Sequence, residues 1–271
     1  MNFADQQRAL SCAVKAARAA GGLMRRNLNL FKKINSSSQH DIKLDLDVRC
    51  QKLIEKTLRA GFPTVAVLGE EGISGNPNAE ERWVVDPIDG TVNFTYGIPH
   101  ACVSIALQVR PPKPATKPGK QQKAEYQTLV GVVYDPFCDE LWTAIRAKPA
   151  RLNGKVIHVS RRRKVSEAIV SMGFAKSRDH LEHTLPHFNL LVRRVRKVRM
   201  MGAAALAMTY VASGRFDAYV ETGIRLWDIA AGGLIVECAG GEFWHEPVEG
   251  EYTYRMFTSN GLLRKKLQAY E

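Results

Sequence analysis

The stretch WVVDPIDGTVNF, from Trp83 to Phe94, ends an apolar run with two acids, Asp86 and Asp89. Two carboxylates about 4 Å apart repel each other by roughly 4 kcal/mol at an effective dielectric constant of about 20, and a cation between them would offset that repulsion. Pro87 fixes its own φ angle, so it stiffens the turn and keeps both acids on one side. Oxygen-only ligation suits Mg²⁺. The stretch therefore predicts a magnesium site; the alternative is an Asp-Pro turn with an aspartate that caps a helix.

The same stretch predicts a seat for an anion beside the cation. Asp86 follows a strand-like run, so we expect it at the carboxyl end of a strand, where α/β sheets bind their ligands. Gly90 allows the backbone to approach a ligand closely. Residues 90–94, GTVNF, are expected to open a helix whose first N–H groups would hold phosphate.

Two other apolar segments lead into acids. LGEEG (68–72) contains Glu70 and Glu71, and Asp228 in LWDIAAGG precedes a strong helical pattern. Taken singly, the first would be a solvated pair and the second a helix cap. Three such transitions in one chain instead favour carboxylates around two metal ions about 3.5–4 Å apart, the geometry of in-line displacement at phosphorus.

Four segments in this order resemble the inositol monophosphatase family: GEE (69–71), DPIDGTVNF (86–94), GAAALAMTYVASGRFDAYVETG (202–223) and WDIAAGGLIVECAGG (227–241). The resemblance covers nearly the whole chain. It implies a Mg²⁺-dependent, lithium-sensitive phosphomonoesterase, usually a homodimer, with a layered αβαβα fold. The site would lie between two α/β lobes, here 1–149, which carries most of the metal motifs, and 150–271.

The resemblance implies two to three Mg²⁺ ions in each site. The first is held by Glu70, Asp86 and the Ile88 carbonyl. The second is held by Asp86, Asp89 and Asp228. A third, weaker ion lies near Glu70 through water, so Glu70 is also expected to take part in catalysis.

The resemblance also implies roles for the residues that face phosphate and substrate. The N–H groups of Gly90 and Thr91 bind the phosphate. The Thr91 hydroxyl, paired with Asp47, orients and activates the attacking water, so no covalent intermediate is needed. The substrate contacts that the resemblance implies are Asp89, Ala203, Ala204 and Glu221. Arg225 would face the far side of the substrate, where it would contact a second phosphate or a carboxylate; the alternative is a solvated loop residue.

Two segments depart from the family pattern. The family often reads D-x-V-T-x-x-D where this chain reads DIKLDLD (41–47), so Asp45 offers a carboxylate that competes with Asp47. Inositol-specific members often carry a lysine on a loop over the site, where this chain reads NSSSQH (35–40). Lys32 or Lys33 would be the substitute.

Several other functions were weighed against inositol monophosphate hydrolysis. A haloacid dehalogenase phosphatase has one residue between its two aspartates, whereas two residues lie between Asp86 and Asp89, which excludes that class. An EF-hand loop is excluded because it needs a glutamate at its twelfth position, which this stretch lacks. Fructose-1,6-bisphosphatase, another sugar phosphatase and histidinol-phosphate phosphatase remain alternatives within the superfamily.

The formal net charge of +12 raises an alternative of another class. Basic residues cluster at 113–123, 161–164 and 193–199, without the interleaved aromatic residues that stack on bases. One interpretation is a solvated surface. The others are a surface for weak contact with RNA, another polyanion or a transcription complex, and steering of an anionic substrate.

The rest of the sequence predicts a globular cytoplasmic protein without a membrane partner. No apolar run approaches the roughly 20 residues of a membrane span. The five cysteines are widely spaced and form no C-x-x-C motif, which fits free thiols in a reducing compartment.

Apolar spacing gives the expected elements. Helices are expected over 4–29, 47–60, 179–195, 203–213 and 228–239. Strands are expected over 65–69, 83–86, 102–109, 128–135, 140–145 and 168–174, then at KVRMMG (197–202) and FDAYVE (216–221), with an enlarged loop at 111–124.

Overall fold

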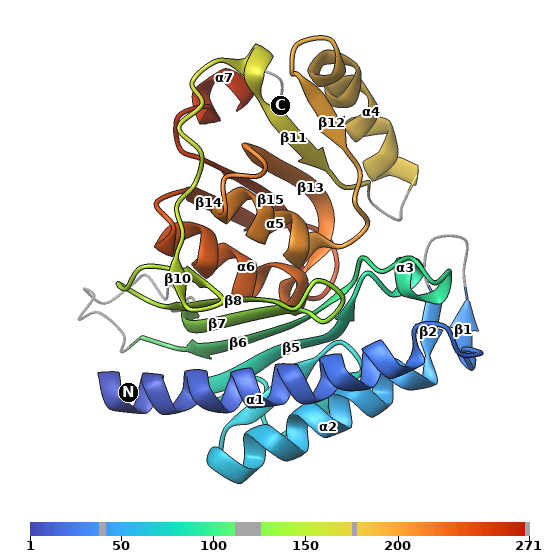
Figure 1. The fold of residues 1–271 in the computed structure, drawn as a ribbon, viewed down its shortest axis with the longest axis vertical. Helices are drawn as coiled ribbons and strands as arrows, with labels where there is room; N and C mark the ends of the chain where they lie inside the picture. Colours follow the sequence, from blue (N-terminus) through green and yellow to red (C-terminus); the bar gives the residue numbers. More distant parts are fainter. Residues whose placement is uncertain (38–41, 112–125, 175–177, 269–271) are drawn as a thin grey trace, which may run out of the picture.

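The structure, a computed structural model, describes residues 1–37, 42–111, 126–174 and 178–268. Its elements stack in the order helices, sheet, helices, sheet, helices (Figure 1). The predicted layered α/β fold is therefore confirmed. All but the first residue of the predicted loop 111–124 lies outside the described residues, as do Asp41 and residues 38–40.

The first layer is a pair of long helices, α1 (Phe3–Asn27) and α2 (Asp45–Gly61). A capping box starts α1, because the Asn2 side chain accepts from the Asp5 N–H at 2.9 Å and the Asp5 carboxylate accepts from the Asn2 N–H at 3.3 Å. The buried stripe of α1 is mostly alanine, which lets the helix lie close to the sheet.

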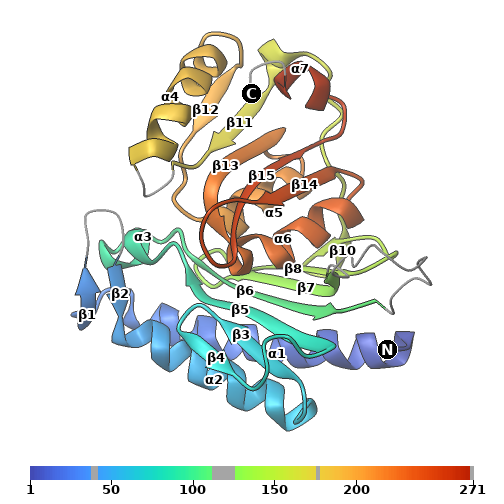
Figure 2. The ribbon, with the colours of Figure 1, turned by 180° about the vertical axis from the view of Figure 1, so that it is seen from behind.

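The second layer is a sheet of eight strands in the order β10-β9-β8-β7-β6-β5-β3-β4. In chain order these are β3 (Ala66–Gly69), β4 (Gly72–Ser74), β5 (Glu81–Asp89), β6 (Cys102–Val109), β7 (Gln127–Asp135), β8 (Glu140–Ile145), β9 (Arg151–Leu152) and β10 (Lys155–Val156). Figure 2 shows α1 and α2 along one face of this sheet. A short helix, α3 (Thr91–Thr95), follows β5 at the edge where the predicted site lies, and the hairpin of β1 (Ile34–Ser37) and β2 (Ile42–Leu44) is near it.

The middle layer is formed by α5 (Ala204–Ala212) and α6 (Leu226–Cys238), which cover the other face of the larger sheet. Beyond them lies a sheet of five strands in the order β12-β11-β13-β15-β14. These are β11 (Ile169–Met172), β12 (Lys197–Arg199), β13 (Ala218–Arg225), β14 (Glu242–Pro247) and β15 (Thr253–Ser259). The last layer holds α4 (Arg178–Val192) and α7 (Arg264–Gln268), and a single turn, η1 (Val165–Glu167), precedes β11.

Three apolar cores separate the five layers. The first lies between α1, α2 and the larger sheet, the second between the two sheets around α5 and α6, and the third under α4 and α7. The second core joins residues of both predicted lobes. The hairpin of β9 and β10 lies beyond residue 149 and still belongs to the larger sheet, so the boundary at 149/150 stays a prediction.

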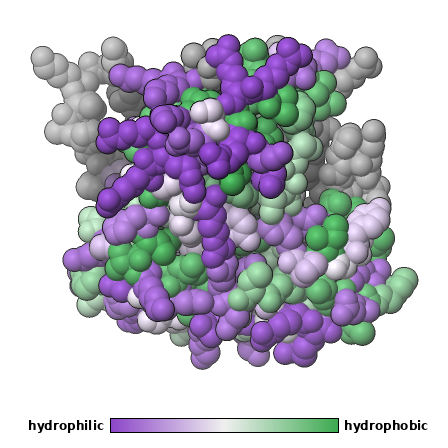
Figure 3. Space-filling model, turned by 45° about the horizontal axis from the view of Figure 1, so that its top comes forward, coloured by the Kyte–Doolittle hydropathy of each residue, from purple (hydrophilic) through white to green (hydrophobic). Residues whose placement is uncertain are grey.

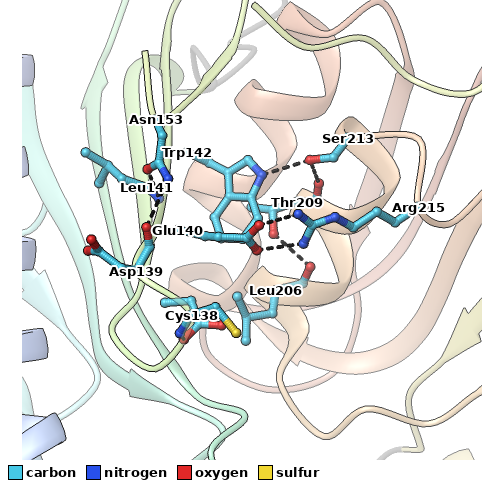
Figure 4. A network of polar contacts seen from close by, with 11 residues as sticks. Cys138, Asp139, Glu140, Leu141, Trp142, Asn153, Leu206, Thr209, Ser213 and Arg215 are labelled. Carbon is cyan, nitrogen blue, oxygen red and sulfur yellow. Dashed lines mark hydrogen bonds and ion pairs between the residues drawn. The ribbon is translucent and has the colours of Figure 1, made fainter. Parts of the chain in front are cut away.

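A polar clamp joins β8 of the larger sheet to the end of α5 (Figure 4). The fully buried Trp142 donates from Nε1 to Ser213 Oγ at 2.8 Å, and Ser213 Oγ in turn donates to the Thr209 carbonyl at 2.8 Å. Arg215 forms a two-pronged ion pair with Glu140. These contacts fix the two lobes against each other at one edge of the middle layer.

Most predicted elements are present, with three corrections. β5 runs through Pro87 to Asp89 instead of ending at Asp86. α6 starts at Leu226, two residues before the predicted start. The strand predicted over 197–202 covers only β12. The strands β14 and β15 were not predicted. All five cysteines are unpaired, and no helix in the described parts of the chain is long and apolar enough to cross a membrane.

Candidate functional site

Three carboxylates from distant parts of the chain meet at the interface of the two sheets. Asp86 and Asp89 come from the end of β5 and Asp228 from the first turn of α6, and one oxygen from each lies within 4.8 Å of the others. Asp86 and Asp89 are only 2% and 6% exposed. The sequence predicted this convergence, which places the three candidate metal ligands at the seam between the lobes.

A bulge in β5 turns both aspartates to the same place. Asp86 pairs with Ser104 of β6 and Asp89 pairs with Cys102, so three steps along β5 face two along β6. Pro87 has no N–H to offer the ladder, and a bulge is one of the few places in a sheet that tolerates proline. Asp86 Oδ1 accepts from the Ile88 N–H at 2.9 Å, which closes the bulge.

Asp89 joins the two lobes through its carboxylate. Its Oδ1 accepts from the Ala204 N–H at 3.0 Å and its Oδ2 from the Ala205 N–H at 2.8 Å, at the start of α5. The Cys102 thiol donates to Oδ2 at 3.5 Å. The start of a helix carries partial positive charge and unsatisfied N–H groups, so α5 stabilises the charged form of Asp89.

Asp228 is held by its own helix. Its Oδ2 accepts from the Arg225 N–H at 2.9 Å, with Arg225 at the cap position and Asp228 three residues later. The interpretation of Asp228 as a simple N-cap is therefore wrong. Because the helix fixes this carboxylate in its first turn, Asp228 faces β5 in a set position.

The carboxylates resist ionisation in each other's presence. Burial, followed by the charges of Glu70, Asp89 and Asp228, raises the pKa of Asp86 well above its ordinary value. Burial also raises the pKa of Asp89 to about 6, although the hydrogen bonds from Ala204 and Ala205 lower it. While these acids are ionised, a cation between them relieves both the cost of burial and the like-charge repulsion. A buried set of oxygen donors therefore fits Mg²⁺.

Glu70 follows β3 directly and lies next to this set. Its charge is the largest neighbouring contribution that raises the pKa of Asp86. Glu70 N–H donates to the Val85 carbonyl at 3.1 Å, so the backbone that carries this carboxylate is tied to β5. The charge of Glu70 thus acts on Asp86, while a part for Glu70 in metal binding or catalysis stays a prediction.

Gly90 sits where no other residue fits. Its φ is +91°, and a Cβ would lie 2.9 Å from the His100 carbonyl oxygen and 3.1 Å from Ala203 Cβ. The next residue, Thr91, donates its hydroxyl hydrogen to the Ile88 carbonyl at 2.8 Å. The carbonyl predicted to bind metal and the hydroxyl predicted to activate water are therefore in contact.

Asp47, and not its rival Asp45, is the buried acid near the start of α2. Asp47 is 2% exposed and accepts from the Leu44 N–H at 2.7 Å. Asp45 instead lies at the surface, 3.9 Å from Arg49. The pairing of Asp47 with Thr91 stays a prediction.

Glu221 stands on β13 on the side of the smaller lobe. It accepts a hydrogen bond from the Tyr219 hydroxyl, and its charge contributes to raising the pKa of Asp89. A Cβ on Gly173 would lie 1.7 Å from a Glu221 oxygen, so a larger residue there would displace this carboxylate from its present position. Ala203 caps α5 and packs against Gly90, which places the predicted substrate contacts around Asp89.

Arg225 is engaged by the chain itself. Its guanidinium donates to the Glu251 carbonyl at 2.6 Å and to Thr253 Oγ1 at 2.7 Å. It therefore holds the turn between β14 and β15. Contact with a second phosphate stays a prediction and would need these bonds to be shared or broken.

Sequence reasoning missed three groups that support the site. Cys102 and the Ala205 N–H hold Asp89, and Asn93 joins the lobes by donating to the carbonyls of His100 and Met201, each at 2.9 Å. Asn93 lies inside the stretch WVVDPIDGTVNF, so the sequence offered a signal for it. Every residue except proline has a backbone N–H, so the sequence offered no signal for the Ala205 contact.

Comparisons with known proteins agree with this geometry. The model described as "Inositol monophosphatase family" matches residues 5–259. The chain is 38% identical over 242 residues to the Nus factor SuhB of Xylella fastidiosa, covering 87% of this chain and 81% of that protein. It is 37% identical over 239 residues to inositol monophosphatase 1 of Solanum lycopersicum, covering 86% of this chain and 82% of that protein. The solved structure of extragenic suppressor protein SuhB from Bartonella henselae superposes with a TM-score of 0.84 at 30% identity, over 96% of each chain.

Proposed function

The chain belongs to the inositol monophosphatase family, and from this premise we propose that it is a Mg²⁺-dependent phosphomonoesterase that hydrolyses inositol monophosphate or a similar small polyol or sugar phosphate. The observation that carries the proposal is the convergence of Asp86, Asp89 and Asp228 within 4.8 Å. Asp86 and Asp89 are buried and Asp228 is partly buried. Stability alone would not keep these three carboxylates together, because each disfavours the charge of the others. Inhibition by Li⁺, a homodimeric assembly and a cytoplasmic location belong to the same proposal.

The residues divide the chemical work among them. Glu70, Asp86, the Ile88 carbonyl, Asp89 and Asp228 would hold two Mg²⁺ ions, with a third near Glu70. When bound, the metal supplies charge stabilisation and lowers the pKa of water. Thr91 and Asp47 would orient the attacking water and accept its proton, and the N–H groups of Gly90 and Thr91 would hold the phosphate in line.

The substrate side points to a polyhydroxylated compound. Glu221 and Asp89 present carboxylate oxygens that accept hydrogen bonds from ring hydroxyls, while the backbone at Ala203 and Ala204 forms a wall beside them. Inositol 1-phosphate is the first candidate. A sugar bisphosphate such as fructose 1,6-bisphosphate is the second, because Arg225 stands three residues before Asp228.

The test is phosphate release from a panel, with Mg²⁺ and with EDTA. The panel contains inositol 1-phosphate, fructose 1,6-bisphosphate, histidinol phosphate, NADP and adenosine 3′,5′-bisphosphate. We expect Mg²⁺-dependent release from inositol 1-phosphate and none with EDTA. Phosphate release that is equally fast with EDTA would contradict the metal mechanism. Faster release from another compound of the panel would replace inositol 1-phosphate as the proposed substrate.

Asp89→Asn tests the site itself. The change removes a negative charge that would face the metal, so we expect a fall in kcat of roughly 100-fold or more, because metal stabilisation is worth several kcal/mol. Asp45→Asn, an exposed acid near the same end of the molecule, is the control and should keep wild-type turnover. Wild-type turnover in Asp89→Asn would remove Asp89 from the metal site.

We propose a second function of another class, a role in a transcription complex. It is favoured by the 38% identity to a Nus factor and by the net charge of +12. The test adds the purified chain to a reconstituted transcription reaction. We expect the wild-type chain to change transcription and the Asp89→Asn variant to have the same effect. If neither protein changes transcription, this second function is contradicted.

A further inference from the structure

Three basic segments, 161–164, 193–199 and 264–266, come together at one end of the smaller lobe, where β11 and β12 begin and α7 lies (Figure 1). We call this surface the basic face. The Lys266 ammonium donates to the Arg163 carbonyl at 2.7 Å, and the Arg196 N–H donates to the Ala168 carbonyl at 2.9 Å. Segment 264–266 is therefore bonded to segment 161–164. Segment 193–199 is bonded to Ala168, four residues after segment 161–164.

A small apolar core fixes the arrangement from beneath. Ala168, Leu191, Val195, Leu263 and Leu267 are all buried in the same cluster. They stand within or next to the three segments. The basic face is thus built on packed structure, because its charged side chains project from backbone that this core holds in place.

The charge of the whole molecule is concentrated on this face. The three segments hold twelve lysines and arginines and no acid, and the net charge of the whole chain is +12. The remainder of the chain is therefore nearly neutral. Glu167, three residues after the first segment, lies 3.4 Å from Lys164, Arg162 pairs with the buried Asp217 at 3.0 Å, and Arg264 lies 3.9 Å from Glu242. Most of the other side chains in the segments are exposed, and Figure 3 shows hydrophilic residues gathered over this end.

The basic face and the candidate active site lie at opposite ends of the smaller sheet. β11 runs parallel to β12 and to β13, and residues 161–164 and 193–197 lie where β11 and β12 begin. Arg199 ends β12 opposite Ser171, so it lies nearer the other end of the sheet than the rest of the basic face. Gly173, against which Glu221 packs, follows the other end of β11. A polyanion on the basic face would therefore be held away from the site carboxylates.

We propose that the basic face binds the phosphodiester backbone of nucleic acid, an activity beyond the proposed phosphatase and independent of it. Arginine predominates in the segments, and its planar guanidinium pairs with phosphate in two-pronged fashion. A shallow, open hollow on part of the face is lined by Ser160, residues 161–164, Glu167 and Gly214. The segments contain no aromatic residue, which leaves neither a platform for stacking on bases nor an aromatic anchor for a membrane. Binding would consequently depend on phosphate and not on base sequence.

The experiment is fluorescence anisotropy with the full chain and a labelled RNA strand about 30 nucleotides long. Single-stranded DNA of the same sequence and both duplexes form parallel arms, which identify the preferred source of phosphate. Salt is varied between about 50 and 200 mM, and log affinity should fall linearly with log salt concentration, by about 0.7 per contacted phosphate for a single strand. Absence of binding at about 50 mM salt would overturn the proposal, as would binding to phosphatidylserine vesicles without binding to any nucleic acid.

The test variant removes one exposed lysine from each segment. It combines Lys164→Gln, Lys197→Gln and Lys265→Gln. We expect affinity at about 100 mM salt to fall at least about tenfold and the salt slope to decrease by about 2. Phosphate release should stay at the wild-type rate, so that failure of this proposal is distinct from failure of the phosphatase.

The matched control removes the same charge from the outer helices α1 and α2. It combines Lys15→Gln, Lys52→Gln and Lys56→Gln, which are also exposed. The control should bind as the wild type does. Equal loss of affinity in both variants would show that net charge alone is responsible, and it would overturn the assignment to the basic face.

Discussion

Gly90 and Gly97 offer a comparison in which only one glycine is crowded. Both have positive φ angles, +91° and +72°, so an alanine at either position is strained by about 1–2 kcal/mol. At Gly90 a Cβ would also meet the His100 carbonyl and Ala203, whereas at Gly97 nothing lies within 4 Å.

We therefore expect Gly90→Ala to lower the free energy of unfolding by at least about 1 kcal/mol more than Gly97→Ala, and to abolish turnover. Urea unfolding of the two variants measures the first effect and phosphate release the second. If the two variants were destabilised equally, the backbone around Gly90 would be free to move away from a new Cβ. The close contact between Gly90 and Ala203 would then not hold the two lobes together.

Thr91 gives the second prediction at the scale of a residue. Thr91→Ala removes the hydroxyl that contacts the Ile88 carbonyl but keeps the N–H that would hold phosphate. We expect kcat to fall by roughly 100-fold, while the inhibition constant of inorganic phosphate changes little. Thr95→Ala is the control, because Thr95 also donates to a backbone carbonyl in α3, at 2.8 Å. Thr91→Ser should recover most of the turnover; a Thr91→Ala variant with raised KM and unchanged kcat would contradict the assigned role.

The clamp between β8 and α5 permits a prediction at the scale of elements. Ser213→Ala leaves the buried Trp142 N–H without its acceptor, which costs about 1–3 kcal/mol of unfolding free energy. In a Trp142→Phe background no N–H is present, so the same change should cost about 1 kcal/mol less. Ser166→Ala, at an exposed serine, is the control. Additive losses in the double-mutant cycle would show that the hydrogen bond does not couple the lobes.

The sequence predicted best those parts of the fold where a chemical role allows only a few residue types. Metal binding requires carboxylates, so Asp86, Asp89 and Asp228 stood out from their neighbours. The bulge in β5 was missed because an Asp-Pro pair fits a turn as well as a bulge, and only pairing with β6 decides between them. β14 escaped because it is a half-buried strand at an edge of its sheet, with polar side chains such as Glu246 beside Arg255 of β15.

The supporting groups could not be predicted for a different reason. The N–H donors that hold Asp89 come from alanines, and any residue other than proline would supply them. Their position depends on how α5 packs between the two sheets. Such contacts follow from the assembled layers and leave no pattern in one segment.

For the whole molecule, the buried acids predict how metal-free stability depends on pH. The folded pKa of Asp89 is about 6, above its ordinary value of 3.8, so the folded state holds this proton more tightly than the unfolded state. The stability that this proton provides is present below about pH 4 and is lost as the pH rises through about 6, up to about 3 kcal/mol. The raised pKa of Asp86 acts in the same direction.

Mg²⁺ would bind the charged form of these acids, so its stabilising effect should grow over the same range. We expect millimolar Mg²⁺ to raise Tm clearly at pH 8 and little at pH 5, as measured by thermal unfolding. Asp86→Asn should raise the metal-free Tm at pH 8 and abolish the shift. A shift of equal size at pH 5 and pH 8 would contradict the arrangement of buried acids.

The bridge from Asp89 to α5 also sets an order of events during synthesis. The ribosome makes β5 well before the chain that holds Ala204, Ala205 and Asp228. At 5–20 residues per second the interval between Asp89 and Asp228 lasts roughly 7 to 30 s. Through that time the larger sheet has one uncovered face, and Asp86 and Asp89 remain in contact with water. A metal ion that needs all three aspartates could therefore be bound only once translation is nearly complete, and a ribosome that stalls before residue 204 would leave an apolar surface for chaperones to shield.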